Sequence, residues 1–392
     1  MKSKLTIILL FCIILFQRIH CMGSDSTQKS SETTSALNII KAHSDQNLLD
    51  CVMPVKDLQA IIMGYLTFES IYNQTVPGNL ITFSPDGTYF VTSDCDGVLN
   101  VYDSKTINFL YKFDGLVGKS RGVSNRLDAC LLLCSPDGKQ IALGAYDQDK
   151  SCILVWDSKT CKLIKALKVP DICTLAYSAD SKYIASGTAD GEIKIWDTKT
   201  FAAPIIYMAH EDCILSLVFS PDGKYLVSGL LNLGNGCLFK IWDATTAKLI
   251  KSVGSGSCES ISYSPDGKQI ICGSNNGDIS IWDAIQFNLI KRVKVTDNSY
   301  SEVHHASYSP DGNYLVTDEY NAVRLWDAKK VLLLQTFAGS SGHKNSTCFS
   351  HDGQRIAFCT QDGIRIINHQ SLALMNDIQI TIKKKNKKKK KK

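Results

Sequence analysis

The 392-residue sequence has no apolar run long enough to cross a bilayer as a helix, because its one marked run, Leu5–Phe16, is only 12 residues long. It also lacks a Cys-x-x-Cys pair, which argues against a zinc ribbon or a thioredoxin-like redox site. Hydrophobic residues make up 44% of the chain and charged residues 21%. These values exclude a disordered chain, a collagen and a multi-span membrane protein.

An excess of positive charge is missing from the body of the chain, although the formal net charge is +5. Nine lysines stand in Lys383–Lys392, and three more basic residues stand in the first 21 positions. Without these two ends, 31 basic residues face 38 acidic ones. A mildly acidic body argues against a surface that binds nucleic acid, so no specific nucleic-acid partner is expected.

Residues 1–23 have the pattern of a secretory signal peptide, since two lysines precede the apolar run Leu5–Phe16. Gly23 offers a small residue at the cleavage point, and cleavage after Cys21 is the alternative. An uncleaved membrane anchor is the competing interpretation. We therefore expect an exported protein whose destination is periplasmic, extracellular or inside a host cell, and no transmembrane span after cleavage.

Three further segments lie outside the repeated part of the chain: residues 24–50, residues 51–78 and residues 383–392. Residues 24–50 are rich in Ser, Thr, Asn and Lys and are predicted to form a disordered linker. The poly-lysine tail, residues 383–392, is predicted to be solvated, because a run of like charges cannot pack. Residues 51–78 are predicted to hold a helix and a lead-in to the next domain.

That helix is predicted over Val55–Leu66, where four apolar residues share one face: Leu58, Ile61, Ile62 and Tyr65. The stretch Met53–Leu66 resembles the opening helix of an F-box, over about a third of that motif. The alternatives are a helix that caps the neighbouring domain and a strand through Tyr65–Phe68 that closes it.

The rest of the chain is a repeat of two signals in fixed order. The first is a Ser-Pro-Asp-Gly turn or a close variant, which begins at Ser84, Ser135, Ser178, Ser220, Ser264, Ser309 and Ser350. The second is an alternating run that ends in Trp-Asp, at Trp156-Asp157, Trp196-Asp197, Trp242-Asp243, Trp282-Asp283 and Trp326-Asp327. Tyr102-Asp103 and Ile367-Asn368 take the same place in the first and last units.

Each unit has the pattern of four short strands around these signals. The strand before the turn ends in an aromatic residue or Cys, and a short apolar run follows the turn, as in Tyr183–Gly187. Alternation then predicts a third strand, as in Glu192–Trp196, and a fourth follows Trp-Asp, as in Lys162–Leu167. Four short strands cannot bury both faces alone, whereas sheets stacked around an axis do so.

With these motifs, the chain resembles the WD-repeat β-propeller family over residues 79–382. The resemblance implies an all-β fold with a single propeller of seven four-stranded antiparallel blades. The last unit is predicted to carry its own outer strand near Leu372–Met375, and an eighth blade, begun by Ile378–Ile382, is the alternative. It also implies a hydrogen-bonded set of His, Ser or Thr, Asp and Trp in each blade. This set is incomplete here, and its best matches are His210, Ser228 and Trp242 in the fourth unit.

The sequence shows no catalytic, cofactor-binding or metal-binding motif. Gly115–Ser120 looks like a phosphate loop, but Phe113 stands where that loop requires glycine. His304 and His305 are adjacent in a predicted strand, so they point to opposite faces and cannot chelate one metal together. The aspartates of the Trp-Asp and Pro-Asp-Gly motifs are explained by turn geometry. We therefore predict no enzyme activity and no cofactor.

The cysteines do not fit an oxidising destination. Of 15, two precede residue 22, and the remaining odd number leaves at least one thiol unpaired. Several occupy strand positions and are predicted to act as small buried hydrophobic residues: Cys134, Cys173, Cys213, Cys272, Cys348 and Cys359. Export to a reducing compartment, such as a host cytosol, would reconcile the signal peptide with these thiols.

These patterns predict a monomeric protein–protein interaction scaffold whose partners bind the propeller loops. The longest predicted loops are Asp114–Asp128, Tyr146–Ser151, Leu230–Gly236 and Thr296–Val303. They contain candidate partner-binding residues of the types common in interfaces: Lys119, Arg121, Arg126, Tyr146 and Tyr300. The alternatives are an F-box-like substrate adaptor for ubiquitin ligation in a host cell and a propeller enzyme with its site at one channel mouth.

Overall fold

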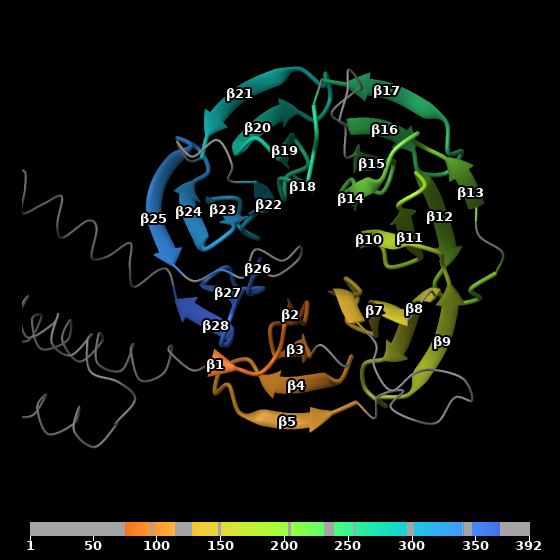
Figure 1. The fold of residues 1–392 in the computed structure, drawn as a ribbon, viewed down its shortest axis with the longest axis vertical. Coiled ribbons are helices and arrows are strands. Elements are labelled where there is room, and N and C mark those ends of the chain that lie inside the picture. The colour runs from red at the N-terminus through yellow and green to blue at the C-terminus, as the bar shows by residue number, and fades with distance from the viewer. Residues whose placement is uncertain are drawn as a thin grey trace, which may run out of the picture. The chain divides into compact units, whose positions relative to one another are not determined.

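The computed structural model describes residues 75–94, 97–113, 128–147, 150–202, 205–230, 239–254, 256–295, 302–338, 340 and 347–368. These residues form 28 β-strands and no helix. The strands build seven antiparallel sheets of four strands each, arranged as blades around a common axis (Figure 1). The predicted all-β propeller of seven blades is therefore confirmed, and the described residues leave no room for an eighth blade in the ring.

Each blade runs outward from the axis in chain order. Blade 1 contains β2 (Leu80–Phe83), β3 (Tyr89–Ser93), β4 (Leu99–Asp103) and β5 (Phe109–Lys112). Blade 2 contains β6 (Asp128–Cys134), β7 (Gln140–Asp147), β8 (Lys150–Asp157) and β9 (Leu163–Lys168). Blade 3 contains β10 (Ile172–Tyr177), β11 (Tyr183–Thr188), β12 (Glu192–Asp197) and β13 (Ile205–Met208). Blade 4 contains β14 (Ile214–Phe219), β15 (Tyr225–Leu230), β16 (Phe239–Asp243) and β17 (Leu249–Val253).

The remaining blades follow the same plan until the last one. Blade 5 contains β18 (Ser260–Tyr263), β19 (Gln269–Gly273), β20 (Asp278–Asp283) and β21 (Leu289–Lys294). Blade 6 contains β22 (Val303–Tyr308), β23 (Tyr314–Glu319), β24 (Ala322–Asp327) and β25 (Leu332–Ala338). Blade 7 contains β26 (Thr347–Phe349), β27 (Arg355–Thr360), β28 (Gly363–Asn368) and, as its outer strand, β1 (Thr75–Val76).

The ring is closed by β1, which comes from the N-terminal side of the chain. Val76 pairs with Ile364 of β28 and packs, nearly fully buried, with residues of blades 1 and 7. The propeller therefore begins before residue 79, and β1 holds the place that the sequence analysis gives to an outer strand near Leu372–Met375. Leu372–Met375 itself lies outside the described residues, as do the signal peptide, the linker, the Val55–Leu66 segment and the lysine tail.

The Ser-Pro-Asp-Gly turn is held together by its own side chains. In blade 1, Ser84 Oγ donates to Asp86 Oδ1 at 2.7 Å and accepts the Tyr89 backbone N–H at 3.0 Å. Gly87 has φ 70°, a conformation that favours glycine. The same serine-to-aspartate bond recurs in the other six blades, including the variant turns at Ser178 and Ser350.

The Trp-Asp motif serves two different purposes in each of the five blades that carry it. The tryptophans are at most 6% exposed and pack in the cores between neighbouring blades. The aspartates cap the turn that follows; Asp157 Oδ1, for example, accepts the Thr160 backbone N–H at 2.7 Å. This hydrogen bond is the main reason that the pKa of Asp157 is lowered. These aspartates are therefore turn residues, as their spacing predicts.

The turn after the third strand ends with a left-handed residue that is not glycine in six blades. These residues are Ile107, Cys161, Phe201, Ala247, Phe287 and Val331, with φ between 48° and 59°. Such a conformation costs L-residues free energy. Several of the side chains are packed in the cores between blades, among them Ile107 and Phe201. Burial therefore opposes the backbone cost at these positions.

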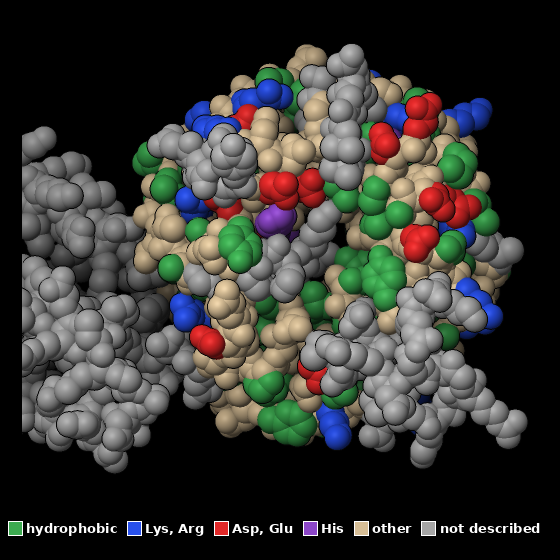
Figure 2. All heavy atoms as spheres, viewed as in Figure 1, with side chains coloured by type: hydrophobic (Ala, Val, Ile, Leu, Met, Phe, Trp, Pro, Cys, Tyr) green, Lys and Arg blue, Asp and Glu red, His purple; other side chains and the backbone are tan. Residues whose placement is uncertain are grey.

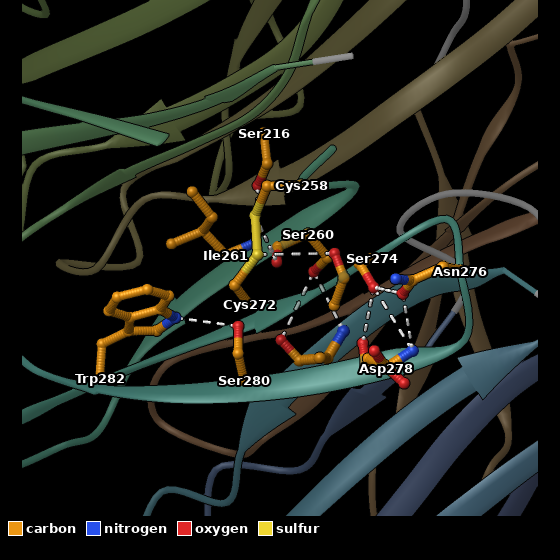
Figure 3. Close-up of a disulfide and its surroundings, with 12 residues drawn as sticks. Ser216, Cys258, Ser260, Ile261, Cys272, Ser274, Asn276, Asp278, Ser280 and Trp282 are labelled. Carbon is orange, nitrogen blue, oxygen red and sulfur yellow. Dashed lines mark hydrogen bonds between the residues drawn. A yellow bond between two sulfur atoms is a disulfide. The ribbon is translucent and has the colours of Figure 1, made fainter. Parts of the chain in front are cut away.

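One disulfide, Cys258–Cys272, joins the segment before β18 to β19 within blade 5 (Figure 3). The prediction that Cys272 is only a small buried hydrophobic residue is therefore wrong. In the β18–β19 ladder Cys272 lies opposite Ile261, and Cys258 precedes the first ladder pair, Ser260–Gly273, so the bond joins β19 to the segment that leads into β18. Among the described cysteines, free thiols are found at Cys130, Cys134, Cys348 and Cys359.

Candidate functional site

The propeller presents two rims of connections, of which one carries most of the sequence variation between blades. We call this rim the top face. It consists of the connections from each outer strand to the next inner strand and of those between the second and third strands of a blade. The opposite face consists of the repeated Ser-Pro-Asp-Gly and Trp-Asp turns. Because those turns are nearly identical from blade to blade, the top face is the better candidate for specific recognition.

The described connections of the top face contain acidic residues and no Lys or Arg. The acidic residues are Asp94, Asp171, Asp190, Glu211, Asp212, Glu259, Glu302 and Asp362. Six of these are exposed, and Glu259 is buried. Figure 2 looks onto this face and shows acidic side chains over several blades, one group of them beside a histidine near the centre, with Lys and Arg mainly along the outer edge. The described part of the top face therefore carries a negative field.

The structure describes one of the five residues that the sequence analysis selects as partner-binding candidates. Tyr146 lies at the end of β7, half-buried, and its hydroxyl donates to the backbone carbonyl of Ile172 in the next blade. This hydrogen bond ties blade 2 to blade 3, so Tyr146 has a structural role. The other four candidates lie outside the described residues: Lys119, Arg121, Arg126 and Tyr300.

The hydrogen-bonded set implied by the resemblance is present in blade 4. Trp242 Nε1 donates to Ser228 Oγ at 2.8 Å, and Ser228 Oγ lies 2.6 Å from His210 Nε2. His210 is 4% exposed, and burial, helped by the charge of Lys240, lowers its pKa to about 3. The neutral, buried His210 therefore connects the segment before β14 to the second and third strands of blade 4, through Ser228 and Trp242.

Other blades keep only part of this set. Trp326 Nε1 donates to Thr317 Oγ1 at 3.1 Å in blade 6, whereas Trp282 Nε1 donates to Ser280 on its own strand at 2.9 Å. In blade 3, Ser186 Oγ is buried and makes no hydrogen bond with any described residue. Packing between blades therefore depends mainly on apolar contact, as the incomplete motifs predict.

The two adjacent histidines of β22 have different surroundings. The ladder shifts register between Val303 and His305, which makes His304 the extra residue of a bulge. His304 Nδ1 lies 3.8 Å from a carboxylate oxygen of Glu302, while His305 Nε2 lies 3.0 Å from Ser307 Oγ. Burial lowers the pKa of His305 to about 4. Neither histidine is part of a metal-binding group in the described residues.

Blade 6 also holds two buried carboxylates that the sequence analysis does not single out. Asp318 accepts hydrogen bonds from Ser340 and Thr347, which come from the connection to blade 7 and from its inner strand. Glu319 pairs with Arg324 across the β23–β24 hairpin. The sequence carries one sign of this role, because Asp318 stands where the second strands of blades 4 and 5 have glycine, at Gly229 and Gly273. Asp318 therefore links blade 6 to blade 7, whereas Glu319 is paired within blade 6.

Comparison with known protein families gives two matches. The model of the WD domain, G-beta repeat, matches residues 79–103, 161–197 and 204–243. The model of the eukaryotic translation initiation factor eIF2A matches residues 235–328. The first of these corresponds to blade 1, to the end of blade 2 with blade 3, and to blade 4, so it follows the repeat that the strands show.

Similar proteins include a WD repeat-containing protein slp1 of Schizosaccharomyces pombe, 29% identical over 38% of this chain and 30% of its own length. Pre-mRNA-processing factor 19 homolog 2 of Arabidopsis thaliana is 23% identical over 69% of this chain and 52% of its own. A guanine nucleotide-binding protein subunit beta of Oryza sativa subsp. japonica is 23% identical over 62% and 67%. The chain thus spans from under a third to about two thirds of these relatives.

A solved structure with the same fold is a chain of the "Crystal Structure of Mitotic Checkpoint Complex", with a TM-score of 0.60 and 15% identity. The match covers 74% of this chain and 89% of that chain. At this identity the likeness concerns the fold alone. The described residues contain no helix that is long and apolar enough to span a membrane.

Proposed function

Because the chain belongs to the WD-repeat β-propeller family, we propose that it is an exported, non-enzymatic scaffold whose top face binds a protein partner. The observation that carries the proposal is the composition of that face. Its described connections vary from blade to blade and hold eight acidic residues without a single Lys or Arg. A partner with a basic segment would complement this field, which favours fast and selective association.

The absence of a catalytic constellation in the described residues supports a binding role over an enzymatic one. An active site needs titratable groups that converge on one point. The buried histidines His210 and His305 belong to different blades, and each lies beside a serine hydroxyl of its own blade. Asp318 and Glu319 have partners within the ring.

Export is proposed on the N-terminal sequence alone. Two lysines followed by the apolar run Leu5–Phe16 are typical of a signal peptide, and the mature chain would begin near Ser24. N-terminal sequencing of the protein from its native source tests this point separately. A mature protein that still begins at Met1 would refute export by signal cleavage without affecting the proposed binding role.

Charge reversal on the top face tests the binding role. Glu211 and Asp212 are adjacent and exposed, and both are changed to lysine. The matched control changes Lys224 and Lys268 to glutamate on the opposite face, where each makes only an exposed ion pair. Partners that co-purify from the native source are first identified with the unchanged chain and then titrated against each variant.

We expect the Glu211→Lys and Asp212→Lys variant to lose affinity at least tenfold at low salt, and the control variant to bind normally. Binding should also weaken as salt rises, because the complementary charges are screened. Equal loss in both variants, or no loss in either, would place the interface elsewhere. The F-box-like alternative predicts instead a partner that is lost when the Val55–Leu66 segment is deleted and kept when the top face is changed.

A further inference from the structure

Two cysteines from neighbouring blades are in contact at the top-face ends of the inner strands. Cys173 belongs to β10 of blade 3, and Cys213 precedes β14 of blade 4. The Cys213 Sγ atom lies 3.3 Å from the Cys173 Sγ atom. The two residues are 40 positions apart in the sequence, so only the packing of β10 against β14 brings them together.

The backbone around the pair is fixed on both sides. The β10–β11 ladder shifts register between Ile172 and Thr174, so Cys173 is the extra residue of a β-bulge. A bulge re-aims the side chain of the extra residue, here toward the next blade. One residue further on, Thr174 Oγ1 accepts the backbone N–H of Leu217 at 3.2 Å, which ties the two inner strands together. The two sulfur atoms are therefore held close by the fold.

Cys130, Cys134 and Cys348 are as partly exposed as this pair, but their sulfur atoms lie in desolvating surroundings. Burial raises the pKa of Cys130, Cys134 and Cys348 to about 12, which leaves them almost entirely as unreactive thiols at neutral pH. Cys173 and Cys213 are both partly exposed at the top-face ends of the inner strands. A small reagent can therefore reach the pair without unfolding the blades.

We propose that Cys173 and Cys213 form a redox modification site that closes into a disulfide between blades 3 and 4. The oxidant is a low-molecular-weight disulfide. The thiolate of one cysteine attacks a sulfur of that reagent, and one small thiolate leaves. The second cysteine thiolate then attacks the mixed disulfide, and the second small thiolate leaves. The two protons of the cysteines end on the two small thiols, so two cysteines are oxidised and one reagent disulfide is reduced.

The geometry requires only a small displacement. A disulfide bond is about 2.05 Å long, so the two sulfur atoms must approach by little more than 1 Å, which rotation of the side chains supplies. The bond would link two blades that are otherwise joined by packing and hydrogen bonds. It would restrict the unfolded chain and hold the top-face ends of blades 3 and 4 in one relative position.

The experiment uses the full chain in buffers with a graded ratio of oxidised to reduced glutathione. Remaining thiols are alkylated, the protein is digested without reduction, and linked peptides are identified by mass. We expect one additional linked pair that contains Cys173 and Cys213, formed as the buffer becomes more oxidising and lost again with dithiothreitol. The melting temperature should rise by several degrees, and the rise should be half complete at the same glutathione ratio as the formation of the linked pair. Alkylation of the two cysteines should decrease together.

Two variants make the result specific. Cys213→Ser should abolish the linked pair and the rise in melting temperature, and leave a single glutathione adduct at Cys173. Cys130→Ser, the matched control on the preceding blade, should keep both. A link that forms only in urea, or a pair that involves Cys130, would overturn the proposal. The proposal would also be overturned if Cys173 and Cys213 of the unchanged chain were still alkylated at every glutathione ratio. This last measurement does not depend on the folding of the variants.

Discussion

Replacing Ala247 with glycine should increase the free energy of unfolding of the propeller. Ala247 ends the turn between β16 and β17, where its φ is 55° and its backbone N–H donates to the carbonyl of Asp243 at 2.9 Å. A left-handed conformation places the Cβ atom of an L-residue close to the backbone and costs roughly 1–2 kcal/mol. Glycine has no Cβ atom and adopts the same φ without this cost.

The expected gain follows from three contributions. Removing the left-handed cost stabilises the fold by roughly 1–2 kcal/mol, while the larger conformational entropy of glycine in the unfolded chain opposes it by roughly 0.5–1 kcal/mol. Ala247 is only partly buried, so the loss of one methyl group has little further effect. The net gain lies between about 0 and 1.5 kcal/mol, with a central value near 0.75 kcal/mol. In a domain of this size, that corresponds to a rise of about 2 °C in melting temperature.

Two comparison variants test the reasoning. Ala244→Gly lies in the same turn without a positive φ, so it relieves no strain, and the entropy term alone lowers stability by about 0.5–1 kcal/mol. The Ala244 methyl group also packs against a core cluster, so the total loss should be larger. Phe201→Gly removes the same kind of strain but also a side chain that is 9% exposed, so stability should fall by at least about 2 kcal/mol. Urea unfolding followed by tryptophan fluorescence measures all three. Equal destabilisation by Ala247→Gly and Ala244→Gly would refute the role of backbone strain.

Three further predictions concern the blades and their closure. Trp242→Ala should cost about 3–5 kcal/mol because the ring is buried and leaves Ser228 without its donor; a loss below about 1 kcal/mol in urea unfolding would contradict the inferred packing. Burial lowers the pKa of His210 to about 3 and that of His305 to about 4, well below the unfolded value of about 6.5. The free energy of unfolding should therefore be greatest above about pH 6.5 and decline as the pH falls from there toward 4. In urea titrations at successive pH values, His305→Gln should flatten that decline; an unchanged slope would contradict a neutral buried His305. Val76→Asp should lower the melting temperature by several degrees, since it puts a charge in the core that closes the ring; no change would show that β1 is dispensable.

Much of the fold could be predicted because its signals are local and repeated. The hydrogen bond from Ser84 to Asp86 and the cap from Asp157 to Thr160 each lie within four residues of sequence. Signals of this kind can be read directly from the order of residue types, and their regular spacing gives the number of blades. The burial of Trp156 and the other motif tryptophans follows, because a large aromatic residue in an alternating strand faces a core.

The closing strand could not be predicted in the same way. β1 has two residues, and its strand character comes from pairing with β28, nearly 300 residues later in the chain. Two residues carry no periodicity of their own. The sequence analysis gives the outer strand of blade 7 to Leu372–Met375 and keeps an N-terminal closing strand, through Tyr65–Phe68, as an alternative. The structure takes the strand from the N-terminal side, at Thr75–Val76.

The candidate site shows the same division. That the loops of the propeller differ in length and composition is visible in the sequence, and so is the acidic character of the chain body. That the acidic residues of different blades share one face follows only from the closed ring. Tyr146 is a partner-binding candidate in the sequence, but the structure gives it a structural role. Its hydrogen bond to Ile172 depends on the packing of blade 2 against blade 3, which the sequence does not show.

The sequence by itself determined the blade, its turns, its four strands and the number of its copies, because each of these depends on contacts within a few residues. The tertiary structure decided which residues of different blades meet. It joined Cys258, in the segment before β18, to Cys272 of β19, placed Cys213 against Cys173 through the packing of two inner strands, and joined Asp318 to Thr347 of the next blade. Such contacts depend on ring closure, which no segment of the chain specifies alone.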